Sequence, residues 1–133
     1  MKKNILNELG KRIVFFDGGM GTLLQERGLE AGQLIENCNL KHPDIIRELH
    51  RDYLNAGADI ILANTFGANE LKFPDNLEEI VTKGVQNAKK AVEETGKDGY
   101  VALDVGPTGK LLKPLGTLDF EDAVSVSYTH LTL

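Results

Sequence analysis

The chain of 133 residues carries a net charge of −5, is 41% hydrophobic and contains a single cysteine, Cys38. Its acidic balance argues against a nucleic-acid-binding surface, which is normally basic, and no apolar run approaches the ~20 residues that span a membrane. One cysteine cannot form an internal disulfide, which is typical of a reducing compartment. We therefore expect one cytoplasmic domain.

The first predicted elements are a strand and two helices. An apolar run at residues 12–17 ends in Asp17 and predicts a buried strand, and residues 22–29 can begin a helix. Residues 30–42 have no clear hydrophobic period, which predicts a long loop. Pro43 suits the first turn of a second helix, and Gly57 suits its C-terminal end.

Two more strands and a helix are predicted further along the chain. Residues 59–64 and 100–104 are apolar runs that end in polar turns. Between them, Asp75 and Glu78 have the spacing of an N-terminal capping box, and Gly96 suits the end of the helix. The helix itself is predicted by an apolar stripe of period near 3.6, formed by Leu77, Ile80, Val81, Val85, Ala88, Ala91 and Val92.

The resulting β-α-β-α-β order predicts an α/β fold with parallel strands, because each connection is long enough for a crossover. Right-handed crossovers place the carboxyl ends of all strands at one edge of the sheet. Three glycine-containing polar turns then converge there, and in α/β folds that edge carries the chemistry. The turns contain Asp17-Gly18-Gly19, Asn64-Thr65 and Asp104.

The turn DGGMGTLL at residues 17–24 fits an amino-acid ligand better than a phosphate. It lacks the spacing of a dinucleotide-binding loop and the lysine of a P-loop, and Asp17 would repel a phosphate. A carboxylate can bind an ammonium, while free N–H groups at a helix start bind a carboxylate. The glycines could instead serve packing alone, Asn64 and Thr65 could cap the next segment, and Asp104 could accept bonds within its own turn.

No motif for a metal site is present. Cys38 stands alone in the predicted loop, and neither His42 nor His50 has a second ligand at a recognised spacing. We expect Cys38 to be neither a nucleophile nor a ligand, and both histidines to be solvated or hydrogen-bonded.

The end of the chain differs from what precedes it. VSYTHLTL, residues 126–133, is a β-like alternating run without a turn signal. It is also the in-frame translation of a transposase-based sequencing adapter. We expect residues 125–133 to be non-native and the natural sequence to stop near Val124, inside an element; the alternative is a genuine C-terminal strand.

Three stretches together resemble homocysteine S-methyltransferases, particularly the homocysteine-binding domain of cobalamin-dependent enzymes that make methionine. They are FFDGGMGTLLQERGL, NLKHPDIIRELHRDYLNAGADIILANTFGAN and DVGPTGKLLKPLGTLDFEDA. The resemblance implies that residues 1–124 form about three βα units of a (β/α)₈ TIM barrel. It also implies that homocysteine is bound at the strand ends, by Asp17, Gly18, Gly19 and Met20 and by Asn64, Thr65 and Asp104.

The resemblance further implies the cofactors and the reaction. Zinc, held by cysteines outside this chain, would activate the homocysteine thiolate, which takes a methyl group from methylcobalamin; a methyltetrahydrofolate domain would recharge the cobalamin. We expect no catalytic or metal-binding residue within the chain. Two alternatives remain: a cobalamin-independent enzyme using betaine or S-methylmethionine, and a truncated product without catalytic activity.

Overall fold

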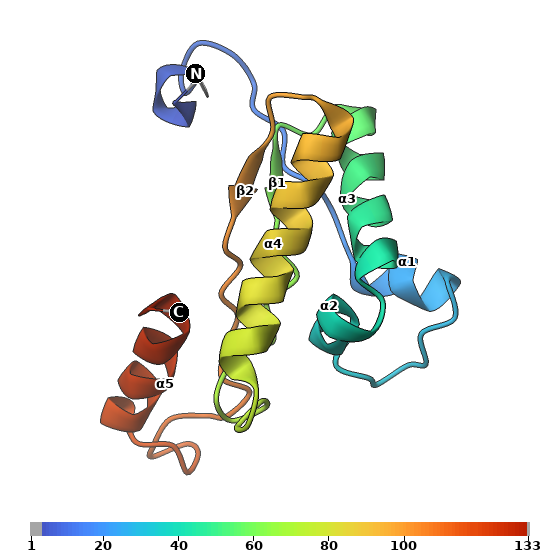
Figure 1. Ribbon diagram of the computed structural model, residues 1–133. Helices are drawn as coiled ribbons and strands as arrows, with labels where there is room; N and C mark the ends of the chain where they lie inside the picture. Colours follow the sequence, from blue (N-terminus) through green and yellow to red (C-terminus); the bar gives the residue numbers. More distant parts are fainter. Residues whose placement is uncertain (1–3, 133) are drawn as a thin grey trace.

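The computed structural model describes residues 4–132, with side chains to residue 127. The chain forms an α/β arrangement in which helices pack on one side of a short parallel sheet (Figure 1). Its elements are η1 (Ile5–Asn7), α1 (Gly21–Glu26), η2 (Ile35–Asn37), α2 (Cys38–Lys41), α3 (Pro43–Ala56), β1 (Ile60–Leu62), α4 (Leu77–Thr95), β2 (Tyr100–Ala102) and α5 (Phe120–Thr132).

The strands run parallel, as predicted. β1 pairs with β2 so that Ile61 lies beside Val101, and Phe16 forms an isolated parallel bridge to Ile60 on the other side of β1. The predicted strand at residues 12–17 is therefore correct in place and direction but wrong in extent, because only one residue of it bridges. The other two strands are each shorter than predicted.

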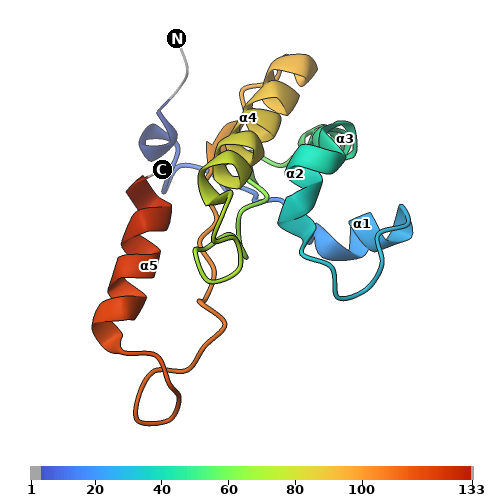
Figure 2. The same cartoon turned by 60° about the horizontal axis from the view of Figure 1, so that its bottom comes forward.

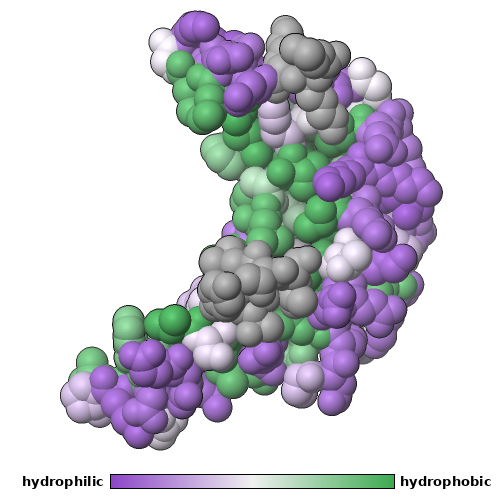
Figure 3. All heavy atoms as spheres, turned by 60° about the vertical axis from the view of Figure 1, so that its left-hand side comes forward, coloured by the Kyte–Doolittle hydropathy of each residue, from purple (hydrophilic) through white to green (hydrophobic). Residues whose placement is uncertain are grey.

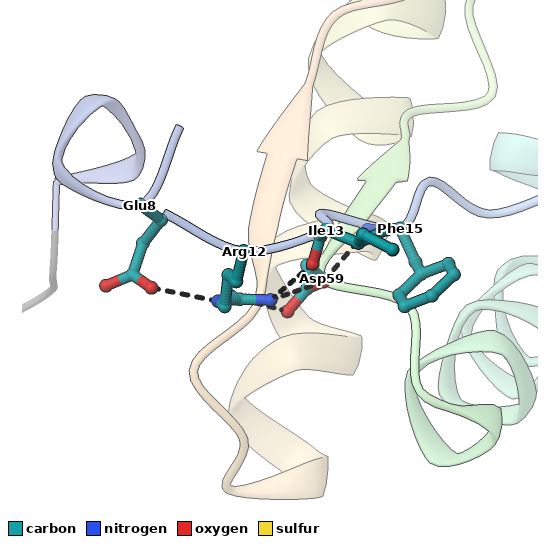
Figure 4. A network of polar contacts seen from close by, with 5 residues as sticks. All are labelled: Glu8, Arg12, Ile13, Phe15 and Asp59. Carbon is teal, nitrogen blue, oxygen red and sulfur yellow. Dashed lines mark hydrogen bonds and ion pairs between the residues drawn. The ribbon is translucent and has the colours of Figure 1, made fainter. Parts of the chain in front are cut away.

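A side-chain clamp explains why the first segment is not a regular strand. Asp59 accepts a hydrogen bond from the Phe15 N–H at 2.9 Å, so this donor does not join a backbone ladder. Both terminal nitrogens of Arg12 also bind the Asp59 carboxylate, at 2.9 and 3.0 Å (Figure 4). The Arg12 guanidinium in turn holds the pKa of Asp59 below its usual range.

Helices α3 and α4 form the layer that covers the sheet. α3 begins at Pro43 and ends at Gly57, whose φ of 110° is the left-handed conformation that glycine adopts most readily. α4 ends at Gly96, also as predicted, but the capping box is wrong. Ile80 N–H donates to the Asn76 carbonyl at 3.0 Å, which makes Asn76 the N-cap and leaves Asp75 outside the helix.

The predicted loop at residues 30–42 is also wrong in part, because η2 and α2 occupy its second half. The residues that anchor these turns are polar: Glu36 and Asn39 are only 3% and 1% exposed. A hydrophobic period could not reveal this segment, since buried polar side chains interrupt it.

The C-terminal segment is helical rather than β-like. Residues 120–132 form α5, which follows a long connection and contacts α4 (Figure 2). Glu121 and Asp122 lie in its first turn, where acidic side chains stabilise a helix. Once a first turn has formed, each further residue joins the helix at a much smaller cost in free energy than the first turn. Within residues 4–132, none of the helices is both long and apolar enough to cross a membrane.

The sheet face opposite α3 and α4 is open. Figure 3 shows a crescent whose hollow side is lined by hydrophobic residues. Several large apolar side chains are exposed in the first segment and just after β2, including Ile13, Phe15, Phe16, Leu103 and Val105. Parallel sheets normally have both faces covered, so this face has the composition of a surface that packs against further structure.

The open face predicts how the 133-residue chain behaves alone. We expect it to associate or to be molten, because exposed apolar surface and an unpaired strand edge both favour aggregation. Size-exclusion chromatography with light scattering and dye binding would measure this. A monodisperse monomer with a cooperative thermal transition would contradict the expectation.

Candidate functional site

The carboxyl ends of the strands meet around one cavity of about 210 Å³. Six of the seven predicted site residues line it: Asp17, Gly18, Gly19, Met20, Asn64 and Asp104. The remaining wall is apolar and comes from Ile35, Leu62, Ala63 and Phe66. The convergence predicted for the strand ends is therefore present, and the cavity combines two carboxylates with an apolar surface.

Asp17 is a carboxylate whose pKa is shifted by its position in this cavity. Its Oδ2 accepts a hydrogen bond from the Leu62 N–H at 3.0 Å, whereas its Oδ1 is buried and has no hydrogen-bond partner among the described residues. The pKa of Asp17 is raised to about 6, mainly by burial and to a smaller extent by the nearby charge of Asp104, against the lowering effect of the backbone hydrogen bonds. A buried carboxylate oxygen without a partner is well placed to accept a hydrogen bond from a cationic ligand.

The glycine turn next to Asp17 supplies hydrogen-bond donors. Among the described residues, the backbone N–H groups of Gly18, Gly19 and Met20 find no protein acceptor. Gly18 is required by packing rather than by its φ, because a Cβ there would lie 2.9 Å from the Tyr53 hydroxyl. The cavity thus offers a carboxylate acceptor beside unused N–H donors, the combination that an α-amino acid needs.

Asn64 is fixed by a buried polar network that the sequence did not reveal. Its side-chain amide donates to the Ile35 carbonyl at 2.9 Å and to Asn39 Oδ1 at 3.0 Å. Asn39 Nδ2 donates in return to the carbonyls of Asn64 and Ile80, at 2.8 and 3.1 Å. Asn39 thereby connects α2, the end of β1 and α4, and it holds one wall of the cavity.

Glu36 fixes the turn that follows β1. Its buried carboxylate accepts a hydrogen bond from the Gly67 N–H at 2.6 Å. A side chain at position 67 would collide with Glu36, since a Cβ there would lie 2.6 Å from Oε1. In the sequence, a buried polar side chain of this kind is visible only as a polar residue in a segment that has no hydrophobic period.

Thr65 lies behind the cavity rather than in its lining. Its side chain is fully buried, and its hydroxyl donates to the Asp104 carbonyl at 2.8 Å while accepting from the Asp104 N–H at 3.2 Å. These bonds fasten the turn after β1 to the turn after β2. Thr65 therefore positions Asp104, which does line the cavity.

The cysteine and histidines lie outside the cavity. Cys38 is free and 3% exposed, and burial raises the pKa of its thiol. The expectation that His50 is solvated or hydrogen-bonded is wrong, because the side chain is fully buried and neither ring nitrogen has a hydrogen-bond partner within the part of the chain that the structure describes. Burial lowers the pKa of His50 to about 4, so the ring is neutral at pH 7. Among the described residues, no three His, Cys, Asp or Glu side chains are grouped to hold a metal ion.

A parallel sheet with helices on one side and a cavity at the carboxyl ends of its strands places this chain in the α/β class, in which ligands commonly bind at that edge. The family model for homocysteine S-methyltransferase matches residues 14–132. The chain therefore belongs to the homocysteine S-methyltransferase family. The sequence resemblance is confirmed by this match.

Curated relatives include two methionine synthases. That of Mycobacterium tuberculosis is 31% identical over 144 aligned positions, and that of Mycobacterium leprae is 32% identical. Each alignment covers 98% of this chain but 12% of the relative, so the chain spans about an eighth of their length.

Solved structures of one enzyme also match. The homocysteine methyltransferase MmuM from Escherichia coli is 30% identical in its metallated form, with a TM-score of 0.66 over 77% of this chain and 41% of that one. Its oxidized form matches with a TM-score of 0.68, over 80% of this chain and 42% of that one.

Proposed function

We propose that this chain is the homocysteine-binding part of a methyltransferase that transfers a methyl group to the sulfur of homocysteine, giving methionine. Residues 1–124 would form the first units of a (β/α)₈ barrel whose later units cover the open apolar face. The observation that carries the proposal is the cavity at the strand ends, where the partnerless Oδ1 of Asp17 lies beside unused backbone N–H groups.

Each part of the ligand has a counterpart in this cavity. The ammonium of homocysteine would bind Asp17, and its carboxylate would bind the N–H groups of Gly18, Gly19 and Met20. The apolar wall that includes Leu62 and Phe66 would contact the methylene groups. Asn64 and Asp104 would line the same cavity, and Thr65 would act by holding Asp104.

The residues of this chain do not fit the zinc ion that the family implies. Cys38 is one buried thiol, and the described residues contain no cluster of three ligating side chains. Zinc sites need three or four protein ligands. We therefore assign zinc, cobalamin and the methyltetrahydrofolate domain to parts outside this chain, and we expect the chain alone to show no methyltransferase activity.

The methyl donor separates two versions of the proposal. The chain is as similar to methionine synthases as to MmuM, at 31% and 30% identity. We propose the cobalamin-dependent type, in which methyltetrahydrofolate is the primary donor, because the turns NTFGAN at residues 64–69 and DVGPTG at residues 104–109 resemble that branch. Assays of the full-length protein that carries this sequence would decide, because methylation by S-methylmethionine or betaine without cobalamin would favour the alternative.

Homocysteine binding to this full-length protein should weaken in acid. Only ionised Asp17 forms a charge-assisted bond to the ammonium, and its pKa of about 6 means that it becomes protonated as the pH falls through 6. We expect the contribution of Asp17 to affinity to fall about tenfold between pH 7.5 and pH 5. Isothermal titration at several pH values would measure it.

The Asp17→Asn variant is the control for this pH dependence, since homocysteine itself has a titratable thiol. The ratio of the wild-type and variant affinities isolates Asp17. A ratio that stays constant from pH 7.5 to pH 5 would contradict the assignment.

A further inference from the structure

The side chain of Tyr53 approaches the glycine turn from α3. Its hydroxyl donates a hydrogen bond to the Gly19 carbonyl at 2.7 Å. Its ring packs against Gly18, where a Cβ would lie 3.3 Å from Cε1 and 2.9 Å from the hydroxyl oxygen. The ring is half-buried and packs on the core around Leu54 and Ile61, so its position is set by the helix layer.

This hydrogen bond determines the direction of one N–H group. The Gly19 carbonyl and the Met20 N–H belong to one planar trans peptide, in which the two groups point in opposite directions. With the carbonyl held by Tyr53, the Met20 N–H must point away from α3. This N–H has no protein acceptor among the described residues, and Met20 lines the cavity.

We propose that Tyr53 is a positioning residue for the ligand carboxylate: by binding the Gly19 carbonyl it directs the Met20 N–H toward the ligand. The inference rests on the proposed function and assigns the two charged groups of the ligand to different residues. Asp17 recognises the ammonium, whereas Tyr53 acts through the backbone on the carboxylate. Burial and the charge of Asp17 both raise the pKa of Tyr53, so its hydroxyl keeps its proton and remains a donor.

The test compares two ligands and two variants of the full-length protein. L-Homocysteine carries both the ammonium and the carboxylate, whereas 3-aminopropane-1-thiol keeps the amine and the thiol but lacks the carboxylate. Tyr53→Phe removes only the hydroxyl and should weaken L-homocysteine binding about 2- to 12-fold, the value of one hydrogen bond. It should leave 3-aminopropane-1-thiol unchanged, whereas Asp17→Asn should weaken both ligands.

A purely structural role for Tyr53 would reduce the affinity for both ligands equally, and that result would overturn the inference, as would no change for either. Absence of L-homocysteine binding by the wild type would instead overturn the proposed function itself. The amide resonance of Met20 gives a second measurement in the wild type. It should shift with L-homocysteine and not with 3-aminopropane-1-thiol, and no difference between the two ligands would count against the inference.

Discussion

Replacing Asp17 with asparagine is expected to weaken L-homocysteine binding to the full-length protein by about 10- to 150-fold. This range corresponds to the ~1.5–3 kcal/mol that a hydrogen bond to a charged group contributes. Asparagine keeps an oxygen that can accept the Leu62 N–H, so the local fold should persist. The variant removes the negative charge while leaving the shape of the side chain almost unchanged.

Asp75→Asn is the matched control for this variant. Asp75 is an exposed aspartate that does not line the cavity, so the same charge change there should leave affinity unaltered. Isothermal titration of both variants gives the comparison, and metal content should equal that of the wild type in each. If the dissociation constant of Asp17→Asn equalled that of the control, Asp17 would have a structural role alone.

Of the substitutions predicted for this protein, removal of the Asn39 side chain is expected to lower the free energy of unfolding the most. Asn39 is 1% exposed and makes three side-chain hydrogen bonds, two to backbone carbonyls and one to Asn64. Truncation leaves buried groups without partners, at about 1–3 kcal/mol each. We expect Asn39→Ala to lower the free energy of unfolding of the full-length protein by about 3–5 kcal/mol.

The same truncation at Asn55 provides the comparison. Asn55 lies exposed on α3, so Asn55→Ala should change stability little. Urea denaturation followed by circular dichroism measures both variants. Equal stability of the two would mean that the Asn39 network does not hold the fold. Asn39→Asp serves as a third variant, because it keeps the size but replaces the Nδ2 donor with an acceptor oxygen that faces the carbonyls of Asn64 and Ile80, and we expect it to be as damaging as alanine.

The parts of the fold that could be predicted are those with strong local signals. α3 was predicted from Pro43 and Gly57, and the parallel order of the strands followed from the crossover lengths. The position of Asp17 at the carboxyl end of the first segment followed from the same reasoning. These features depend on backbone conformation and on hydrophobic period, which are readable from one sequence.

The features that could not be predicted depend on contacts between distant residues. The segment 12–17 bridges at one residue because Asp59, far along the chain, takes the Phe15 N–H. η2 and α2 were missed because Glu36 and Asn39 face inward and bind backbone groups 25 or more residues away. Tyr53 had helical spacing, but its bond to Gly19 appears only in three dimensions.

The predicted boundary near Val124 stays a prediction. The family match extends over residues 14–132, and the backbone is helical through Thr132. Sequencing the genomic reading frame beyond codon 124 would establish whether residues 125–133 are native, and a genomic frame that encodes VSYTHLTL would contradict the expectation.

The central claim is that the cavity at the strand ends binds homocysteine through Asp17. A crystal structure of the full-length protein with L-homocysteine tests it most directly. We predict that the ammonium lies within hydrogen-bonding distance of the Asp17 carboxylate and that the ligand carboxylate meets the N–H groups of Gly18, Gly19 and Met20. Homocysteine bound elsewhere, or bound with its carboxylate toward Asp17, would contradict the claim.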